Sequence, residues 1–179
     1  MIAGNRLINY LRISVTDRCN CRCMYCVPTQ PFQEAIHHGK IARYEEILKI
    51  TRLACEMGIT KVRITGGEPF VRKGIFSFLE DLASIDTLKD ISVTTNGALL
   101  TPEKIDRLLK IGIKRLNFSL DTLIPEKFRQ ITGRDEFQTV WENLMAAHRA
   151  GMNPIKVNAV ALKGINDDEL ASLARLTLE

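Results

Sequence analysis

The chain lacks the features that mark membrane, secreted and nucleic-acid-binding proteins. None of its apolar runs approaches the ~20 residues of a membrane span, and its first ten residues, MIAGNRLINY, lack the cationic-then-apolar order of a secretory signal. Its 25 basic and 21 acidic residues leave a net charge of only +4, with no Lys/Arg run to concentrate it. We therefore expect a cytoplasmic protein with no membrane partner and no nucleic-acid partner.

Cysteine is scarce outside one short segment. The chain has five cysteines, an odd number, and four of them lie between residues 19 and 26. This pattern is not a disulfide framework, and free thiols belong in a reducing compartment. The 179 residues, 45% of them hydrophobic, are enough for one domain with a sizeable core.

Cys19, Cys23 and Cys26 follow a C-x3-C-x2-C spacing. Thiolates are the preferred ligands of iron–sulfur centres, so the spacing favours a cluster held by three cysteines. Three ligands leave one iron with an open position, where a bound molecule can react. Cys21 would have to fold back toward a cluster that its neighbours already hold, so we expect it not to be a ligand.

A zinc site or a redox dithiol could also use a C-x2-C pair. Zinc would need a fourth ligand, and the candidates are Cys21, Cys55 and the His37–His38 pair, which lies in a loop expected over residues 27–42. Cys55 falls on the core side of an expected helix, and a dithiol does not need the third cysteine. A zinc-stabilised binding module without catalysis is thus the alternative from a different class of protein.

Strand-like and helix-like patterns alternate along the chain. Strict alternation predicts an α/β fold with a parallel sheet and right-handed crossovers. The last strand would have no further neighbour, which leaves an exposed edge. Strands are expected at 10–16, 61–65, 90–95, 115–120 and 155–161, and helices at 44–57, 75–84, from 101, 125–131, 136–149 and from 168.

Each expected strand has one apolar face and one polar face, because successive side chains point to opposite sides. In the first strand, for example, Leu11 and Ile13 oppose Arg12 and Ser14. We expect the apolar faces to meet the helices and the polar faces to line a lumen filled by a polar ligand. Ser92 is expected to satisfy the amide of Asn117.

Arg12, Arg63 and Lys156 come from three strands and fall on the same polar face. Cations that converge in a cavity repel one another, so they imply an anion, and a polyphosphate matches arginine forks well. Asp121 is a candidate ion-pair partner for any one of them.

The turn Gly66-Gly67-Glu68-Pro69 follows the second of the expected strands. Two glycines allow backbone to approach a ligand closely, at the end of the strands where such folds place their active sites. Glu68 is expected to act more through its backbone than through its carboxylate.

Several sequence motifs together resemble those of a known family. An aromatic residue before the last cysteine, here Tyr25, resembles the signature of the radical S-adenosylmethionine (SAM) enzymes. From about Tyr10 onward the chain resembles the GTP 3′,8-cyclases of molybdenum cofactor biosynthesis. The words that carry the resemblance are LRISVTDRCNCRCMYCVP, VRITGGEP, TTNG, LNFSLD, ITGRD and KVNAV.

The resemblance implies an incomplete (β/α) barrel of the radical SAM type, with five strand–helix units and a polar lumen. Residues 1–179 would form the radical SAM domain, truncated before the family's sixth strand and its C-terminal region with a second 4Fe–4S cluster. The implied enzyme is a lyase in which a reduced 4Fe–4S cluster cleaves SAM to a 5′-deoxyadenosyl radical. That radical takes the 3′ hydrogen of GTP, and C3′ then bonds to C8.

The resemblance also implies roles for individual residues and partners. Tyr25, Gly67 and Ser119 would contact SAM, and Arg12, Arg63, Thr94 and Lys156 would contact GTP. An electron donor and a downstream cyclic pyranopterin monophosphate synthase are the implied partners, and a homodimer is compatible with the family. A peptide-modifying radical SAM enzyme is the alternative within the superfamily, and the three inward cations count against it. Alone, this chain is expected to be poorly active.

Overall fold

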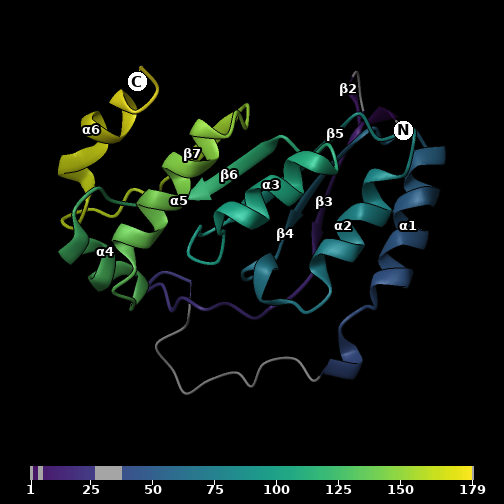
Figure 1. The fold of residues 1–179 in the computed structure, drawn as a ribbon. Helices are drawn as coiled ribbons and strands as arrows, with labels where there is room; N and C mark the ends of the chain where they lie inside the picture. The colour runs from purple at the N-terminus through teal and green to yellow at the C-terminus, as the bar shows by residue number, and fades with distance from the viewer. Residues whose placement is uncertain (1, 4–5, 27–37, 179) are drawn as a thin grey trace.

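The computed structural model describes residues 2–3, 6–26 and 38–178, and its centre is a five-stranded parallel sheet (Figure 1). The strand order is β3-β4-β5-β6-β7, so each strand pairs with its neighbours in the sequence. A small antiparallel pair, β1 (Ile2–Ala3) and β2 (Arg6–Leu7), precedes it. The sheet strands are β3 (Tyr10–Ser14), β4 (Lys61–Thr65), β5 (Asp90–Thr95), β6 (Arg115–Ser119) and β7 (Ile155–Asn158).

A helical segment follows each of these strands, which confirms the predicted alternation. The α-helices are α1 (Tyr44–Glu56), α2 (Ile75–Ala83), α3 (Pro102–Lys110), α4 (Pro125–Thr132), α5 (Phe137–Arg149) and α6 (Leu170–Arg175). Within the described residues, three 3-10 turns accompany them: η1 (His38–Lys40), η2 (Pro69–Val71) and η3 (Asp167–Glu169). Most of the loop expected over 27–42, including His37, lies outside the described residues.

Strand β7 ends earlier than the sequence predicts. The expected strand ran to residue 161, whereas the ladder stops at Asn158. The backbone N–H of Val160 donates to the carboxylate of Asp121 (2.8 Å) instead of to a strand partner. A side-chain acceptor thus replaces the ladder at this point.

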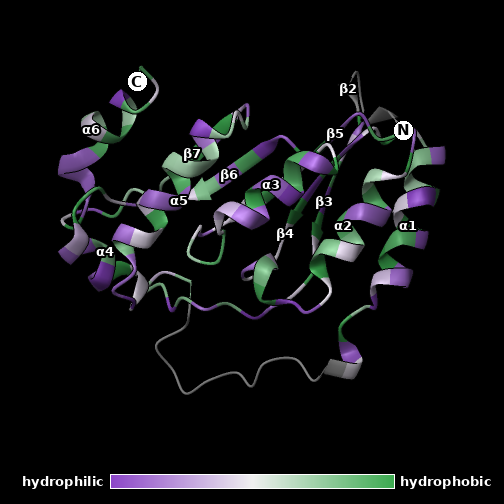
Figure 2. Cartoon of the chain, viewed as in Figure 1, coloured by the Kyte–Doolittle hydropathy of each residue, from purple (hydrophilic) through white to green (hydrophobic). Residues whose placement is uncertain are grey.

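The apolar faces of the strands pack against the helices, as predicted. Val62, Ile64, Val93, Leu116 and Phe118 are all buried in one cluster with residues of α2 and α3. The helices are amphipathic, with hydrophobic and hydrophilic residues alternating along each of them (Figure 2). The core therefore lies between the sheet and one layer of helices.

The opposite face of the sheet is polar and, at its two outer strands, open to solvent. Arg12 and Ser14 on β3 and Lys156 and Asn158 on β7 are exposed. Strands β3 and β7 each have one neighbour, so the sheet does not close. This arrangement confirms an incomplete barrel. Among the described helices, none is long and apolar enough to cross a membrane.

Candidate functional site

The cysteine loop leaves the carboxyl end of β3 and is anchored on the far side of the sheet. The backbone N–H groups of Arg22 and Met24 donate to the carbonyls of Thr132 (2.8 Å) and Ile131 (2.9 Å), at the end of α4. Arg134 donates from Nε to the carbonyl of Asn20 (2.6 Å). The ITGRD motif thus anchors the cysteine loop, a role that the sequence did not predict.

The four thiols of the loop differ in exposure and ionisation. Cys19 and Cys26 are exposed, Cys23 is partly buried and Cys21 is buried. A hydrogen bond from the Cys21 thiol, more than any other cause, lowers the pKa of Cys19 to about 6. The same bond, with burial, raises the pKa of Cys21. Burial raises the pKa of Cys23 to about 11.

The donor set fits an iron–sulfur cluster, because the loop holds four free thiols and thiolates are the ligands that such clusters take. In the described part of the chain, no three Cys, His, Asp or Glu side chains are gathered closely enough to hold a single metal ion. Each thiolate of a cluster binds a different iron, so Cys19, Cys23 and Cys26 need not converge on one point as the ligands of a single ion would.

The glycine turn packs directly on the strand end that leads into the cysteine loop. Gly67 donates its N–H to the carbonyl of Thr16 (2.7 Å), and Glu68 donates to the carbonyl of Arg18 (2.8 Å). A Cβ at position 67 would overlap the backbone carbonyl of Arg18. The close approach that sequence reasoning expected toward a ligand is, in the structure, an approach to the chain's own backbone.

Glu68 uses its carboxylate as well as its backbone. The side chain is fully buried and accepts hydrogen bonds from Phe70 N (3.1 Å), Thr95 Oγ1 (2.9 Å) and Asn96 N (2.7 Å). Burial outweighs these donors and raises the pKa of Glu68 from its ordinary 4.5 to about 7. Sequence reasoning missed this role, because the acceptor and two of its donors are more than 25 residues apart.

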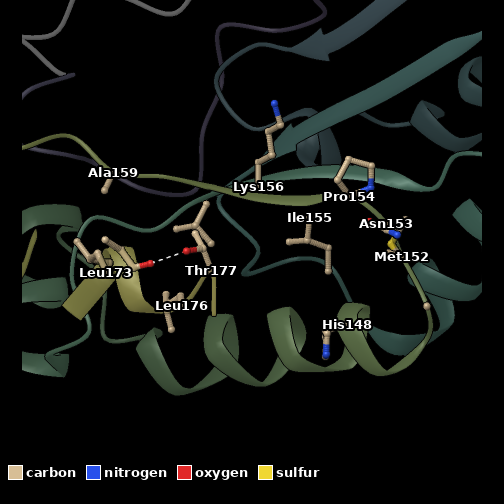
Figure 3. A pocket seen from close by; sticks show the side chains of 13 residues that line it. His148, Met152, Asn153, Pro154, Ile155, Lys156, Ala159, Leu173, Leu176 and Thr177 are labelled. Atoms are coloured by element: carbon tan, nitrogen blue, oxygen red, sulfur yellow. Dashed lines mark hydrogen bonds between the residues drawn. The ribbon is translucent and has the colours of Figure 1, made fainter. Parts of the chain in front are cut away.

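The three predicted cations share the polar face, and only Arg12 and Arg63 are neighbours on it. Arg12 and Arg63 are register partners on neighbouring strands. Lys156 stands on β7 at the opposite edge of the sheet, and Figure 3 shows it pointing away from α5 while Ile155 points toward that helix. The register pairs that establish the common face are Arg12–Arg63, Arg63–Ser92, Thr94–Asn117 and Asn117–Lys156.

The charge partners on this face differ from those predicted. Arg115, a cation that the sequence reasoning did not place here, forms an ion pair with Asp90. The Arg63 guanidinium lies over the ring of Tyr10, 5.5 Å from its centroid. Asp121, the candidate ion-pair partner, instead accepts hydrogen bonds from Tyr25 and from a backbone N–H.

Thr94 and Asn117, register partners on the polar face, both have buried side-chain atoms without a partner. Both amide atoms of Asn117 and the hydroxyl of Thr94 are buried and make no hydrogen bond within the described structure. The expectation that Ser92 satisfies Asn117 is therefore wrong. Buried polar atoms are almost always satisfied, so this pair fits a polar ligand on the face where the resemblance places the nucleotide.

The residues that the resemblance assigns to SAM lie at the carboxyl ends of the strands. Gly67 is in the turn after β4, and Ser119 is the last residue of β6 and partly buried. Tyr25 is in the cysteine loop, and its hydroxyl donates to Asp121 (2.7 Å). The three residues thus come from three separate segments at one end of the sheet.

A groove of about 840 Å³ lies elsewhere, along the free edge of β7 (Figure 3). Residues of β7, of the end of α5 and of α6 line it, among them Ile155, His148 and Leu173. Its wall includes the unpaired side of a strand and carries none of the thiols. The groove is therefore an uncovered edge of the fold, apart from the cysteine loop.

Comparison with known proteins identifies the class first. Residues 13–177 match the radical SAM superfamily, so the chain belongs to that superfamily. The superfamily uses a 4Fe–4S cluster and SAM, and these are the cofactors of this chain.

Several curated relatives carry the name GTP 3′,8-cyclase. The protein of Thermodesulfovibrio yellowstonii is 52% identical over 170 residues, which cover 95% of this chain and 52% of the relative. That of Geobacter sulfurreducens is 51% identical over 174 residues, 97% of this chain and 53% of the relative. The chain spans about half the length of these relatives.

Solved structures show the same fold at lower identity. SuiB of Streptococcus suis, bound to the precursor peptide SuiA, superposes with a TM-score of 0.76 at 22% identity, over 95% of this chain and 37% of SuiB. The same protein bound to SAM gives a TM-score of 0.72. At this identity the likeness establishes the fold alone, and it does not favour the peptide-modifying alternative.

Proposed function

We propose that this chain carries the radical SAM domain of a GTP 3′,8-cyclase, a lyase of molybdenum cofactor biosynthesis. One observation carries the proposal: a polar sheet face with Arg12, Arg63 and Lys156 lies on the strands whose carboxyl ends meet the cysteine loop. A site for an anion and a site for a cluster thus occupy one sheet. Identities near 50% to proteins of that name support GTP as the anion.

The residue assignment is part of this proposal. Cys19, Cys23 and Cys26 would hold the cluster, and Cys21 would remain a thiol that donates to the sulfur of Cys19. Tyr25, Gly67 and Ser119 would contact SAM. Arg12, Arg63, Thr94 and Lys156 would contact GTP, and the unpartnered hydroxyl of Thr94 supports this role.

When bound, the reduced cluster supplies the electron that cleaves SAM and so starts radical chemistry on the nucleotide. The chain contributes position and charge. Arg12 and Lys156, from opposite edges of the sheet, would hold the triphosphate between them, and Arg63, beside Arg12, would add a further positive charge. Thr94 and Asn117 would bond the polar groups of the nucleotide that lie over the centre of the sheet.

Hydrogen abstraction requires a placement accurate to within about an ångström. In the resembled cyclases, a second 4Fe–4S cluster in the C-terminal region holds the guanine end of GTP. We therefore expect residues 1–179 alone to cleave SAM and to release little cyclised nucleotide. We also propose that the protein receives its electron from a separate donor and supplies a downstream cyclic pyranopterin monophosphate synthase. It would form a homodimer and be located in the cytoplasm.

The test begins with protein prepared without oxygen. Iron, sulfide and zinc are quantified first. About four irons per chain with a brown colour are expected, whereas colourless protein that contains zinc would favour a non-catalytic binding module over an enzyme. The reduced protein is then incubated with SAM and GTP, and both 5′-deoxyadenosine and cyclised nucleotide are measured. A full-length relative serves as the control for cyclisation. Binding of SAM without measurable binding of GTP would contradict the proposed substrate.

A further inference from the structure

Asn96, the residue that follows β5, reaches from the sheet into the cysteine loop. Its side-chain nitrogen Nδ2 lies 2.7 Å from Asn20 Oδ1, 3.3 Å from Cys21 Sγ and 3.7 Å from Cys19 Sγ. An amide nitrogen has two hydrogens. One of them meets the oxygen of Asn20, and the other faces the two sulfurs.

The orientation of this amide is fixed from both ends. Asn96 Oδ1 accepts the backbone N–H of Ala98 (3.1 Å), so the nitrogen must be the atom that faces the sulfurs. The backbone N–H of Asn96 donates to the buried carboxylate of Glu68 (2.7 Å). Glu68 belongs to the glycine turn, whose backbone is itself bonded to residues 16–18. Asn96 is therefore held in a frame shared by the glycine turn and the start of the cysteine loop.

We propose that Asn96 is a positioning residue for the cluster, which donates an N–H···S hydrogen bond to the sulfur of Cys19 and thereby sets how easily the cluster is reduced. The inference rests on the proposed function in one respect, namely that Cys19 is a cluster ligand. Reduction adds negative charge to the cluster and its sulfurs, and a hydrogen-bond donor stabilises that charge. The bond raises the reduction potential and so favours transfer of an electron from the donor to the cluster.

Cys21 offers a different reading of the same contact, because its sulfur is nearer to the amide than that of Cys19. If the amide served only Cys21, its effect would vanish when that thiol is removed. If it serves Cys19, removal of Cys21 leaves the second hydrogen of the amide to Cys19 alone. The Cys21→Ala background therefore separates the two readings.

The test is a potentiometric titration of the reconstituted cluster, followed by electron paramagnetic resonance, for wild type, Asn96→Ala and Asn96→Asp. Asn96→Asp keeps the shape of the side chain and replaces the donor by a charged acceptor. We expect the midpoint potential to fall in Asn96→Ala and to fall further in Asn96→Asp, in the wild-type and in the Cys21→Ala background. Gln138→Ala removes an exposed amide on α5 and should leave the midpoint unchanged.

Each other outcome also decides the question. An unshifted midpoint with full iron content in both Asn96 variants overturns the proposal, as does a shift that disappears in Cys21→Ala. Loss of iron in both variants, with a wild-type unfolding transition of the apo-protein, supports positioning of the loop. Loss of iron together with the unfolding transition overturns the proposal, because Asn96 would then serve the fold only. If reconstituted wild-type protein contains no iron, both the proposed function and this inference are wrong. If it contains iron but forms no cyclised nucleotide, this inference is unaffected.

Discussion

Tyr25 Oη donates a 2.7 Å hydrogen bond to Asp121 Oδ2, which ties the cysteine loop to the segment that follows β6. The other carboxylate oxygen accepts the backbone N–H of Val160 after β7 (2.8 Å). The Asn166 side chain bonds the backbone carbonyls of Asp121 and Val160. Burial, followed by the bond to Asp121, raises the pKa of Tyr25. A single carboxylate thus joins the loop to the ends of two strands.

Tyr25→Phe should therefore destabilise the apo-protein by about 1–2 kcal/mol, because a bond to a carboxylate is lost at a partly exposed site. Denaturant unfolding gives the free energy. A double-mutant cycle with Asp121→Asn isolates the pair, since asparagine keeps an acceptor for Val160. A coupling free energy indistinguishable from zero would show that the bond contributes nothing.

The cysteines should fall into two groups in an iron analysis. Alanine at Cys19, Cys23 or Cys26 should abolish both the cluster and the cleavage of SAM, because each would remove a thiolate ligand. Cys21→Ala should retain most of the iron, since this buried thiol acts as a hydrogen-bond donor to Cys19. If Cys21→Ala loses iron as completely as Cys23→Ala, the ligand assignment is wrong.

The cations of the polar face should matter for the nucleotide and much less for SAM. Neutralising Arg12, Arg63 or Lys156 to glutamine should weaken binding of a nucleoside triphosphate by about 1.5–3 kcal/mol, as for other charge-assisted contacts. Calorimetry measures both ligands. Arg149→Gln, at an exposed position at the end of α5, is the control for net charge. Equal losses for all four variants would indicate a general charge effect and contradict a defined anion site.

Gly67→Ala should cost more than a glycine substitution that meets no neighbour. Its Cβ would overlap the carbonyl of Arg18, so the turn or the entry to the cysteine loop must shift, at a cost of about 1–3 kcal/mol or more. Gly112→Ala is the comparison, because it meets nothing within 4 Å and carries only the strain of a φ of +87°. Similar unfolding free energies for the two variants would contradict the tight packing of the turn.

Glu68 should make the stability of the apo-protein depend on pH. Its pKa is raised in the fold from 4.5 to about 7, so the folded protein binds more protons than the unfolded chain between these values. Its contribution to stability is full below about pH 4.5 and is lost as the pH rises through about 7, a change of about 3 kcal/mol at most. Glu68→Gln should flatten this part of the profile. A wild-type profile that rises over the same range, relative to the variant, would show the opposite sign.

The sequence predicted the alternation and the two faces of the sheet because these follow from local periodicity. Val62 and Ile64 could only be buried if Arg63 faced the other way. The partners of the polar residues could not be predicted in the same manner. The Tyr25–Asp121 bond spans 96 residues and depends on where the cysteine loop crosses the sheet. Likewise, the local sequence pattern does not predict that Asn117 has no hydrogen-bond partner within the described structure.

The site shows the same division. The spacing of the cysteines and the position of the glycine turn can be read directly from the sequence. The cysteine loop and the glycine turn both follow strands, as expected. The role of Asn96 was missed because it depends on a rotamer fixed by Ala98 and on a backbone position fixed by Glu68. The word TTNG was the available signal, since it ends a strand beside the glycine turn.

The strictly sequential strand order has a consequence for how the protein is made. Each strand of the sheet pairs only with strands next to it in the sequence, from β3 through β7. During synthesis, every newly emerged strand and its helix can therefore dock on the edge left by the preceding unit, without waiting for a distant segment. The sheet can therefore form during translation one strand at a time, because the order of synthesis is also the spatial order of the strands.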